Sequence, residues 1–322
     1  MNLDDSSLKL CHFKLYGRTV YFWQSNTKGK GLKKSQNAPA CLNGSSIFEL
    51  DALGTHWWIE TLDDALTDEI KASIVNTIRV FERQYTRFSD DSLLGQLNLH
   101  KRLMAPPVEM LAMLEFAGNL QDITGGVFNI SVGGELVRRG YGKTGEGRIS
   151  ASFWGEVKLT PVEIRIPGGI SLDFGGFGKG WLIDSVGDLL KDSGKQHFII
   201  NGGGDILVNA PMPLEFALEH PLDSCTSIGT TRIQNGALAV SSNRKRTWQH
   251  QGKNQQHIID PRTSAPATSA DINSTYVRAK SALIADACAT ILLIAPELDE
   301  ALTQKYGLKT ILLNSSQLSH SN

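Results

Sequence analysis

Four stretches of the chain place apolar residues three and four positions apart, which is the spacing of one face of a helix. In the first stretch, Ile70, Ile74 and Ile78 fall on the same side. The last stretch is apolar on nearly every side, as is typical of a helix surrounded by other elements. The pattern predicts helices over Leu66–Tyr85, Met110–Gln121, Gly180–Lys191 and Ala279–Ala295.

Shorter apolar runs between these helices have the length and residue types of strands. Strands and helices do not alternate strictly along the chain, which favours an α+β fold over a doubly wound parallel sheet. The predicted strands are Ile47–Leu53, Val162–Ile166, Ile170–Phe174, Phe198–Ile200, Leu214–Leu218, Ala237–Val240, His257–Ile259, Ser274–Ala279 and Thr310–Leu313.

The first 46 residues differ in composition from the rest of the chain. The run Lys28–Lys34 is polar and rich in glycine and lysine, and Ser35–Ser46 holds few apolar side chains. This composition favours an extension or linker over a packed element. We therefore predict a loosely ordered N-terminal extension over residues 1–46 and one domain over residues 47–322.

Composition and charge exclude several function classes. The 322 residues are 41% hydrophobic and 20% charged, and their net charge of -1 provides no global field that would recruit nucleic acid or an anionic membrane. The four cysteines are scattered without a CxxC pair, which argues against a zinc site and a disulfide framework. No secretory signal pattern and no stretch of membrane-spanning length is visible, so we expect a cytoplasmic protein.

Glycine is frequent, with 31 residues. One glycine-rich candidate for a ligand site is the segment Leu172–Asp184. Here an apolar run is followed by a glycine-rich turn and the start of a helix. Free N–H groups at a helix N-terminus bind phosphate, and Lys179 would neutralise the charge of that phosphate. The spacing matches neither the Walker A loop nor the dinucleotide-binding fingerprint, so the segment alone is a weak indication.

Two other glycine clusters allow a structural explanation. The segment Asp122–Ser131 contains two adjacent glycines, which suit either a helix C-cap or a backbone that approaches a flat ligand. The segment Asn201–Asp205 has three successive glycines between apolar runs, for which a tight turn is the more common explanation.

The helix over Ala279–Ala295 contains a candidate metal site. Asp286 and Thr290 are four residues apart, so their oxygens lie on one helix face. A bare carboxylate in apolar surroundings is costly, and a divalent cation would compensate it. Oxygen ligands favour magnesium over zinc. A buried aspartate paired with a lysine or with backbone donors explains the pattern equally well, and both interpretations stay open.

The segment Gln256–Ser264 contains the candidate catalytic base, His257. Histidine accepts a proton near neutral pH, which suits activation of a hydroxyl nucleophile. A hydrogen-bonded core histidine followed by a turn at Asp260–Thr263 is the simpler structural alternative.

Taken together and in this order, eight segments resemble the ApbE family of FAD:protein FMN transferases. The resemblance runs from about residue 53 to residue 295. The matching segments are Leu53–Thr55, Phe88–Asn98, Gly125–Ile130, Leu172–Asp184, Asn201–Asp205, Ala239–Ser242, His257–Thr263 and Ala285–Thr290.

The resemblance implies a mixed fold of antiparallel sheets with packed helices and an FAD site in a cleft between the lobes. Asp173 and Lys179 match residues that contact FAD. Gly176, Asp286 and Thr290 match a backbone carbonyl, an aspartate and a threonine that hold magnesium. The positions that line the flavin or the adenine correspond to Leu53, Phe88, Gly126, Val127, Phe128, Asn129 and Ile259.

The resemblance also implies the reaction. A Ser or Thr hydroxyl of an acceptor flavoprotein attacks the FMN phosphorus of FAD, AMP leaves, and His257 takes the hydroxyl proton. Two alternatives use the same nucleotide site. One is magnesium-dependent hydrolysis of FAD to FMN and AMP, and the other is a non-catalytic FAD-binding module.

Two residues depart from the pattern of the family. Asn129 stands where the family usually has aspartate, and it supplies neither a negative charge nor a base. Ser264 stands where the family usually has glycine. If the backbone there needs a positive φ, serine strains the turn.

Overall fold

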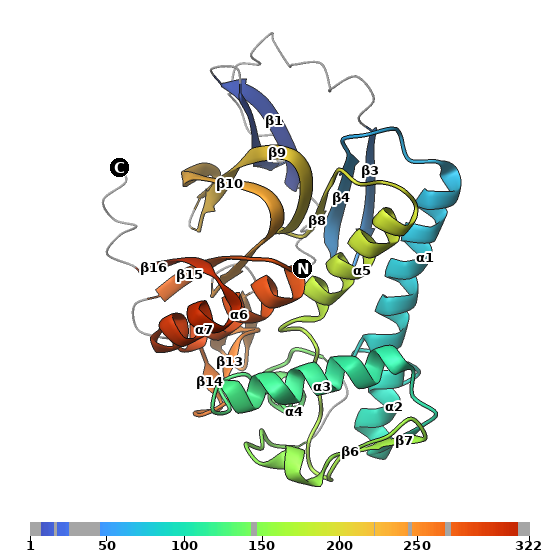
Figure 1. Cartoon of the computed structure of the whole chain (residues 1–322). Coiled ribbons are helices and arrows are strands. Elements are labelled where there is room, and N and C mark those ends of the chain that lie inside the picture. Colours follow the sequence, from blue (N-terminus) through green and yellow to red (C-terminus); the bar gives the residue numbers. More distant parts are fainter. Residues whose placement is uncertain are drawn as a thin grey trace.

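The computed structural model describes residues 8–15, 18–25, 46–142, 147–221, 223–243, 247–267 and 272–314. Figure 1 shows curved strands in the upper half of the molecule, with helices in front of them and below. The protein is therefore a mixed α+β fold, as the sequence predicted.

The main sheet of the described residues has the order β16-β15-β10-β9-β8-β4-β3, and β2 joins it beside β9. All of its described pairs are antiparallel except that of β2 with β9. Its strands are β1 (Leu8–Leu15), β2 (Arg18–Ser25), β3 (Ser46–Ala52), β4 (Thr55–Thr61), β8 (Phe198–Gly202), β9 (Asp205–His220), β10 (Asp223–Ser242), β15 (Ile272–Ala279) and β16 (Lys309–Asn314).

Smaller sheets carry the remaining strands. They are β5 (Arg102–Met104), β6 (Lys158–Leu159) and β7 (Glu163–Arg165) in one sheet, the hairpin of β11 (Thr247–His250) with β12 (Lys253–Gln256), and the hairpin of β13 (Ile259–Asp260) with β14 (Ala265–Pro266).

The four predicted helices are present, and side-chain oxygens cap two of them at their first residues. Thr67 accepts the N–H of Ile70, and Ser281 accepts the N–H of Ile284. The helices are α1 (Asp68–Tyr85), α2 (Leu93–His100), α3 (Val108–Ile123), α4 (Gly133–Arg138), α5 (Gly178–Asp192), α6 (Ala282–Ile294) and α7 (Asp299–Tyr306), and 3-10 turns cover Phe153–Glu156 and Pro296–Leu298.

The two faces of the main sheet bury different cores. Ile59 and Ile200 contribute to a large core that includes α1, α5 and α6. Their neighbours Trp58 and Ile199 belong to a second core with Phe216 from the outer part of β9. Side chains alternate between the faces of a strand, so β4 and β8 supply both cores. All of β8 is buried, and β4 is buried from Trp57 onwards. This buried sheet fixes the positions of α5 and α6.

Two of the predicted strands are wrong. Over Ile170–Phe174 there is only an isolated bridge from Ser171, because the side chain of Asn98 satisfies both the N–H and the carbonyl of Leu172. The predicted strand over His257–Ile259 begins only at Ile259, and His257 lies in a bend before it.

Within the predicted N-terminal extension, the backbone of β1 and β2 forms a hairpin whose second strand pairs with β9. The other residues of 1–45 lie outside the described part of the chain, so the proposed division at residue 46 stays a prediction. None of the helices among the described residues combines the length and the hydrophobicity that a membrane span requires.

Candidate active site

A lysine between two aspartates lies where α5, α6 and β9 meet. Lys179, in the first turn of α5, forms an ion pair with Asp205 at the start of β9. Its Nζ also lies 3.6 Å from Oδ1 of Asp286 on α6. Both carboxylate side chains are nearly inaccessible to solvent, so their charges depend on Lys179 for compensation.

The close approach of α5 and α6 depends on a glycine and on a shared cap. A Cβ at Gly180 would lie only 2.4 Å from the carbonyl oxygen of Ala282. The Gly180 N–H donates to Oδ2 of Asp286 at 2.9 Å. Asp184 of α5 accepts the N–H groups of Ala282 and Leu283 at 2.8 and 2.9 Å, which caps α6. The two helices therefore hold Lys179 and Asp286 in fixed register.

Burial raises the pKa of Asp286 to about 6, although the neighbouring Lys179 ammonium acts in the opposite direction. Asp205 adds a second negative charge beside Asp286 and raises its pKa further. The two carboxylates and the one ammonium group leave an excess of negative charge, which a further cation would neutralise.

The three residues implied as magnesium ligands come from adjacent parts of the structure. Thr290 follows Asp286 by one helical turn, and its Oγ1 lies 3.3 Å from Oγ of Ser241. A Cβ at Gly176 would lie 3.7 Å from Cγ2 of Thr290. A carboxylate, a hydroxyl and a backbone carbonyl are the oxygen donors that a hard divalent cation prefers, so the residues present fit magnesium.

The glycine-rich loop before α5 is fixed by Asp173. Its Oδ1 accepts the Gly175 N–H at 2.7 Å, and its Oδ2 forms an ion pair with Nε of Arg87. Arg87 is buried, donates to the Tyr141 carbonyl at 2.8 Å, and lies 4.4 Å from the centroid of the Phe88 ring. Phe88 is 57% exposed. Arg87 thus joins two predicted FAD contacts, Asp173 and Phe88.

The sequence patterns did not identify Arg87 and Asp205 as site residues. Arg87 directly precedes the Phe88–Asn98 segment, and Asp205 ends the Asn201–Asp205 segment. Their ion-pair partners are distant in sequence, which is why no local spacing identified them.

The segment around Gly126 lies against the same loop. Val127, Phe128 and Asn129 are buried, and Cε2 of Phe128 would lie 3.4 Å from a Cβ at Gly176. The amide of Asn129 donates to the Ser150 carbonyl at 3.0 Å. An aspartate cannot make this donation, which is a structural reason for the departure at this position.

Leu53 lies in the turn between β3 and β4, with a φ of 53°. This turn is next to the one that leads into Asp205, because the Gly203 N–H donates to the His56 carbonyl at 3.1 Å. A Cβ at Gly203 would strike the Thr55 side chain at 2.4 Å. The glycine run therefore allows the two turns to pack together.

His257 and Ile259 lie between β12 and β14. Ile259 is buried, and His257 is partly buried in the bend that precedes β13. The turn after β13 brings Ser264 to a φ of 56°, so the strain anticipated for a non-glycine residue is present. The chemical role of His257 stays a prediction.

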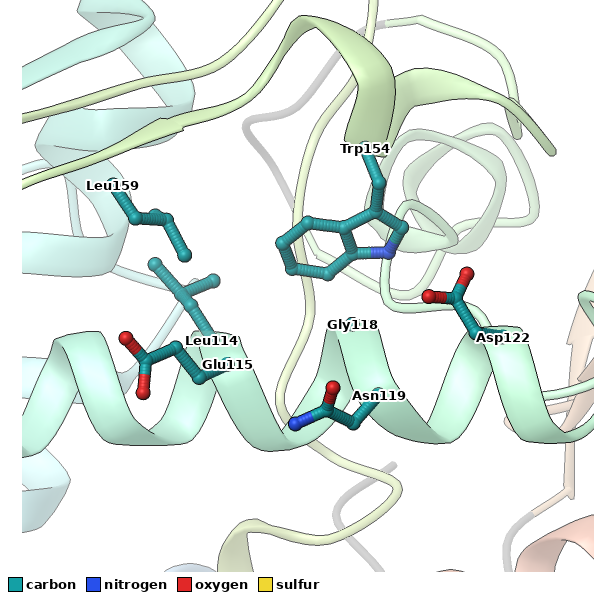
Figure 2. Close-up of a pocket in the computed structure, with 7 residues that line it drawn as sticks. All are labelled: Leu114, Glu115, Gly118, Asn119, Asp122, Trp154 and Leu159. Atoms are coloured by element: carbon teal, nitrogen blue, oxygen red, sulfur yellow. The ribbon is translucent and has the colours of Figure 1, made fainter.

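A surface groove of about 350 Å³ lies along α3. Figure 2 shows the Trp154 ring standing over the helix, with Glu115 and Asp122 on either side. A hydrogen bond of 2.9 Å from Nε1 of Trp154 to Gln121 fixes the ring. None of the predicted site residues lines this groove.

Comparison with known proteins agrees with the predicted family. The FAD:protein FMN transferase of Vibrio cholerae is 26% identical over 234 residues, which cover 66% of this chain and 70% of that protein. The protein of the same name from Escherichia coli K12 is 21% identical over 310 residues, or 87% of each chain.

Solved structures share the fold. The ApbE protein of Thermotoga maritima superimposes with a TM-score of 0.71 at 20% identity, covering 83% of this chain and 94% of that one. The flavinyl transferase ApbE of Pseudomonas stutzeri gives 0.69 at 18% identity, covering 83% and 90%. The model of the ApbE family matches residues 53–312, and this chain belongs to the ApbE family.

Proposed function

We propose that this protein transfers the FMN half of FAD to a Ser or Thr hydroxyl of an acceptor flavoprotein and releases AMP. The observation that carries the proposal is the arrangement of Lys179 between Asp205 and Asp286, beside a glycine-rich loop and Thr290. The N–H groups of Gly178 and Gly180 at the start of α5 already donate to the Phe174 carbonyl and to Asp286. The arrangement therefore suits a pyrophosphate through its lysine and through the oxygen ligands that would hold a cation. The relatives are named for the transfer of FMN from FAD to a protein, which supports this part of the proposal.

In the proposed reaction the acceptor oxygen forms a bond to the FMN phosphorus, and the anhydride bond to the AMP phosphate breaks. His257 takes the proton of the acceptor hydroxyl. Lys179 offsets negative charge on the pyrophosphate. Asp173 holds the glycine-rich loop before α5 in place through its hydrogen bond with the Gly175 N–H. Asp286, Thr290 and the Gly176 carbonyl would hold Mg²⁺, which would supply Lewis-acid stabilisation of the phosphate oxygens.

The direct test is incubation of the protein with FAD, Mg²⁺ and a peptide that carries a candidate acceptor Ser or Thr. We expect a peptide whose mass increases by that of FMN less one water, with AMP released in equal amount. Free FMN and AMP without labelled peptide would instead identify an FAD hydrolase.

A His257→Ala variant separates catalysis from binding. We expect it to bind FAD with unchanged affinity and to label the peptide at least about 100-fold more slowly, because general-base catalysis contributes about 10²–10⁴-fold. Wild-type protein that binds FAD but releases no AMP with any acceptor would support a binding module and contradict the proposal.

A further inference from the structure

The segment that carries His257 is attached to α4 by one arginine. Nη1 of Arg139 donates to Oε1 of Gln255 at 2.8 Å, and Nη2 donates to the Ser264 carbonyl at 2.6 Å. These two acceptors flank His257 and Ile259 in the sequence. A single guanidinium therefore bridges both ends of the bend that contains the candidate base.

Arg139 is itself held in place from two directions. Its Nε donates to Oε1 of Glu135, one helical turn earlier, at 2.8 Å. Its carbonyl accepts the indole N–H of Trp248 at 2.7 Å, and the Trp248 ring stacks on Tyr141 with centroids 4.8 Å apart. With its backbone and its Nε anchored, the guanidinium has little freedom to leave Gln255 and Ser264.

The geometry requires arginine specifically. The planar fork of a guanidinium presents donors in several fixed directions, whereas an ammonium group is a compact charge at the end of a flexible stem. A lysine at residue 139 would keep the ion pair with Glu135 but would not bridge Gln255 and Ser264 simultaneously.

We propose that Arg139 is a positioning residue that holds the bend around His257 in the orientation needed for proton transfer. This inference rests on the proposed function, since it assumes that His257 acts as the base. Arg139 acts through the bend and touches neither Lys179 nor Asp286 in any described contact. Its effect is therefore on the catalytic step rather than on FAD affinity.

The neighbouring arginine is a matched control. Arg138 also forms an ion pair with Glu135, but its side chain is 53% exposed and the described contacts link it to no residue of the His257 segment. Replacing Arg138 removes the same charge from the same helix end and leaves the bridge intact.

The test compares Arg139→Ala, Arg139→Lys and Arg138→Ala in the full-length protein. We expect both Arg139 variants to lower kcat for peptide labelling by about 10-fold, with the KM for FAD nearly unchanged, because misplacing a base slows proton transfer. Arg138→Ala should stay within twofold of the wild type. Equal losses in Arg138→Ala, or full activity in Arg139→Lys, would overturn the proposal.

A double variant tests whether Arg139 acts through His257. In a His257→Ala background, Arg139→Ala should cost less than about threefold, because residues that act as a unit are not additive. The full 10-fold loss in that background would contradict the inference.

Hydrogen exchange gives a readout that does not need turnover. Amides of residues 253–264 should exchange at least about 10-fold faster in Arg139→Ala than in Arg138→Ala. Unchanged exchange would overturn the proposed anchoring even if the wild type transferred FMN. Faster exchange in Arg139→Ala, together with a wild type that transfers no FMN, would instead place the failure in the proposed function.

Discussion

The ammonium group of Lys179 forms an ion pair with Oδ1 of Asp286 at 3.6 Å and a closer one with Asp205. One lysine thus serves two buried carboxylates. The negative charge on Oδ1 of Asp286 is only partly compensated at this distance, as is expected of a cation ligand.

Replacing Asp286 should therefore remove most of the magnesium-dependent activity. We expect Asp286→Ala to lower the rate of FMN transfer by about 10²–10³-fold, because a metal ion supplies several kcal/mol of charge stabilisation. The measurement is the labelling rate at saturating FAD over a magnesium titration. Asp188→Ala, at an exposed residue of α5, should stay within twofold of the wild type. Near-normal activity of Asp286→Ala would make Asp286 a structural residue.

Asn129→Asp should destabilise the fold even though it restores the residue usual in the family. The Asn129 amide donates to the Ser150 carbonyl and its oxygen accepts the Ser131 N–H, so aspartate would lose the first bond and place a charge beside a carbonyl. We expect a loss of about 1–3 kcal/mol in the free energy of unfolding, measured by urea denaturation at pH 7.5. The exposed Asn119→Asp is the control. A variant as stable as the wild type would show that the Ser150 contact contributes little.

Ser264→Gly should stabilise the protein. Ser264 has a φ of 56°, and a side chain in this region costs about 1–2 kcal/mol, part of which glycine returns as extra entropy of the unfolded chain. We expect a net gain of about 0.5–1 kcal/mol in unfolding free energy. Ser264→Ala, which removes the hydroxyl but keeps the Cβ, should show no gain. Equal effects of the two substitutions would rule out backbone strain as the cause.

Glu60 on β4 should make stability fall as the pH rises. Its side chain is buried, and Oε2 has no hydrogen-bond partner among the described residues. Burial raises the pKa of Glu60 from the ordinary 4.5 to about 7. The folded protein therefore keeps a proton that the unfolded chain releases, so stability declines between pH 4.5 and 7, by about 3 kcal/mol.

Glu60→Gln tests this pH dependence. The glutamine cannot ionise, so the variant should lack the Glu60 contribution to the decline and should gain stability over the wild type as the pH rises towards 8. Denaturation midpoints at pH 5 and pH 8 provide the comparison. A constant difference between the two proteins at both pH values would contradict the raised pKa.

Local periodicity and family resemblance predicted the fold and much of the candidate site. The apolar spacing at Ile70, Ile74 and Ile78 identified α1, because its buried face repeats with the helical period. Helix α2 was missed, since Leu93–His100 is short and contains a glycine. The run at Ile170–Phe174 was taken for a strand because a sequence pattern does not reveal that Asn98 satisfies the backbone of Leu172.

The contacts that assemble the candidate site join residues far apart in the chain. Arg87 and Asp173 are 86 positions apart, and Arg139 and Gln255 are 116 apart. No spacing rule connects such pairs. The sequence supplied the residue types, and the packing of α4, α5 and α6 against their neighbouring segments determined which of them meet.

The central claim is that the acceptor of the FMN group is a protein hydroxyl. The most direct measurement is mass spectrometry of a candidate acceptor flavoprotein co-expressed with this chain, with its His257→Ala variant, or alone. We predict a mass increase equal to FMN less one water, located on one Ser or Thr, only with the wild-type chain. An unmodified acceptor together with FAD consumed to free FMN and AMP would contradict it.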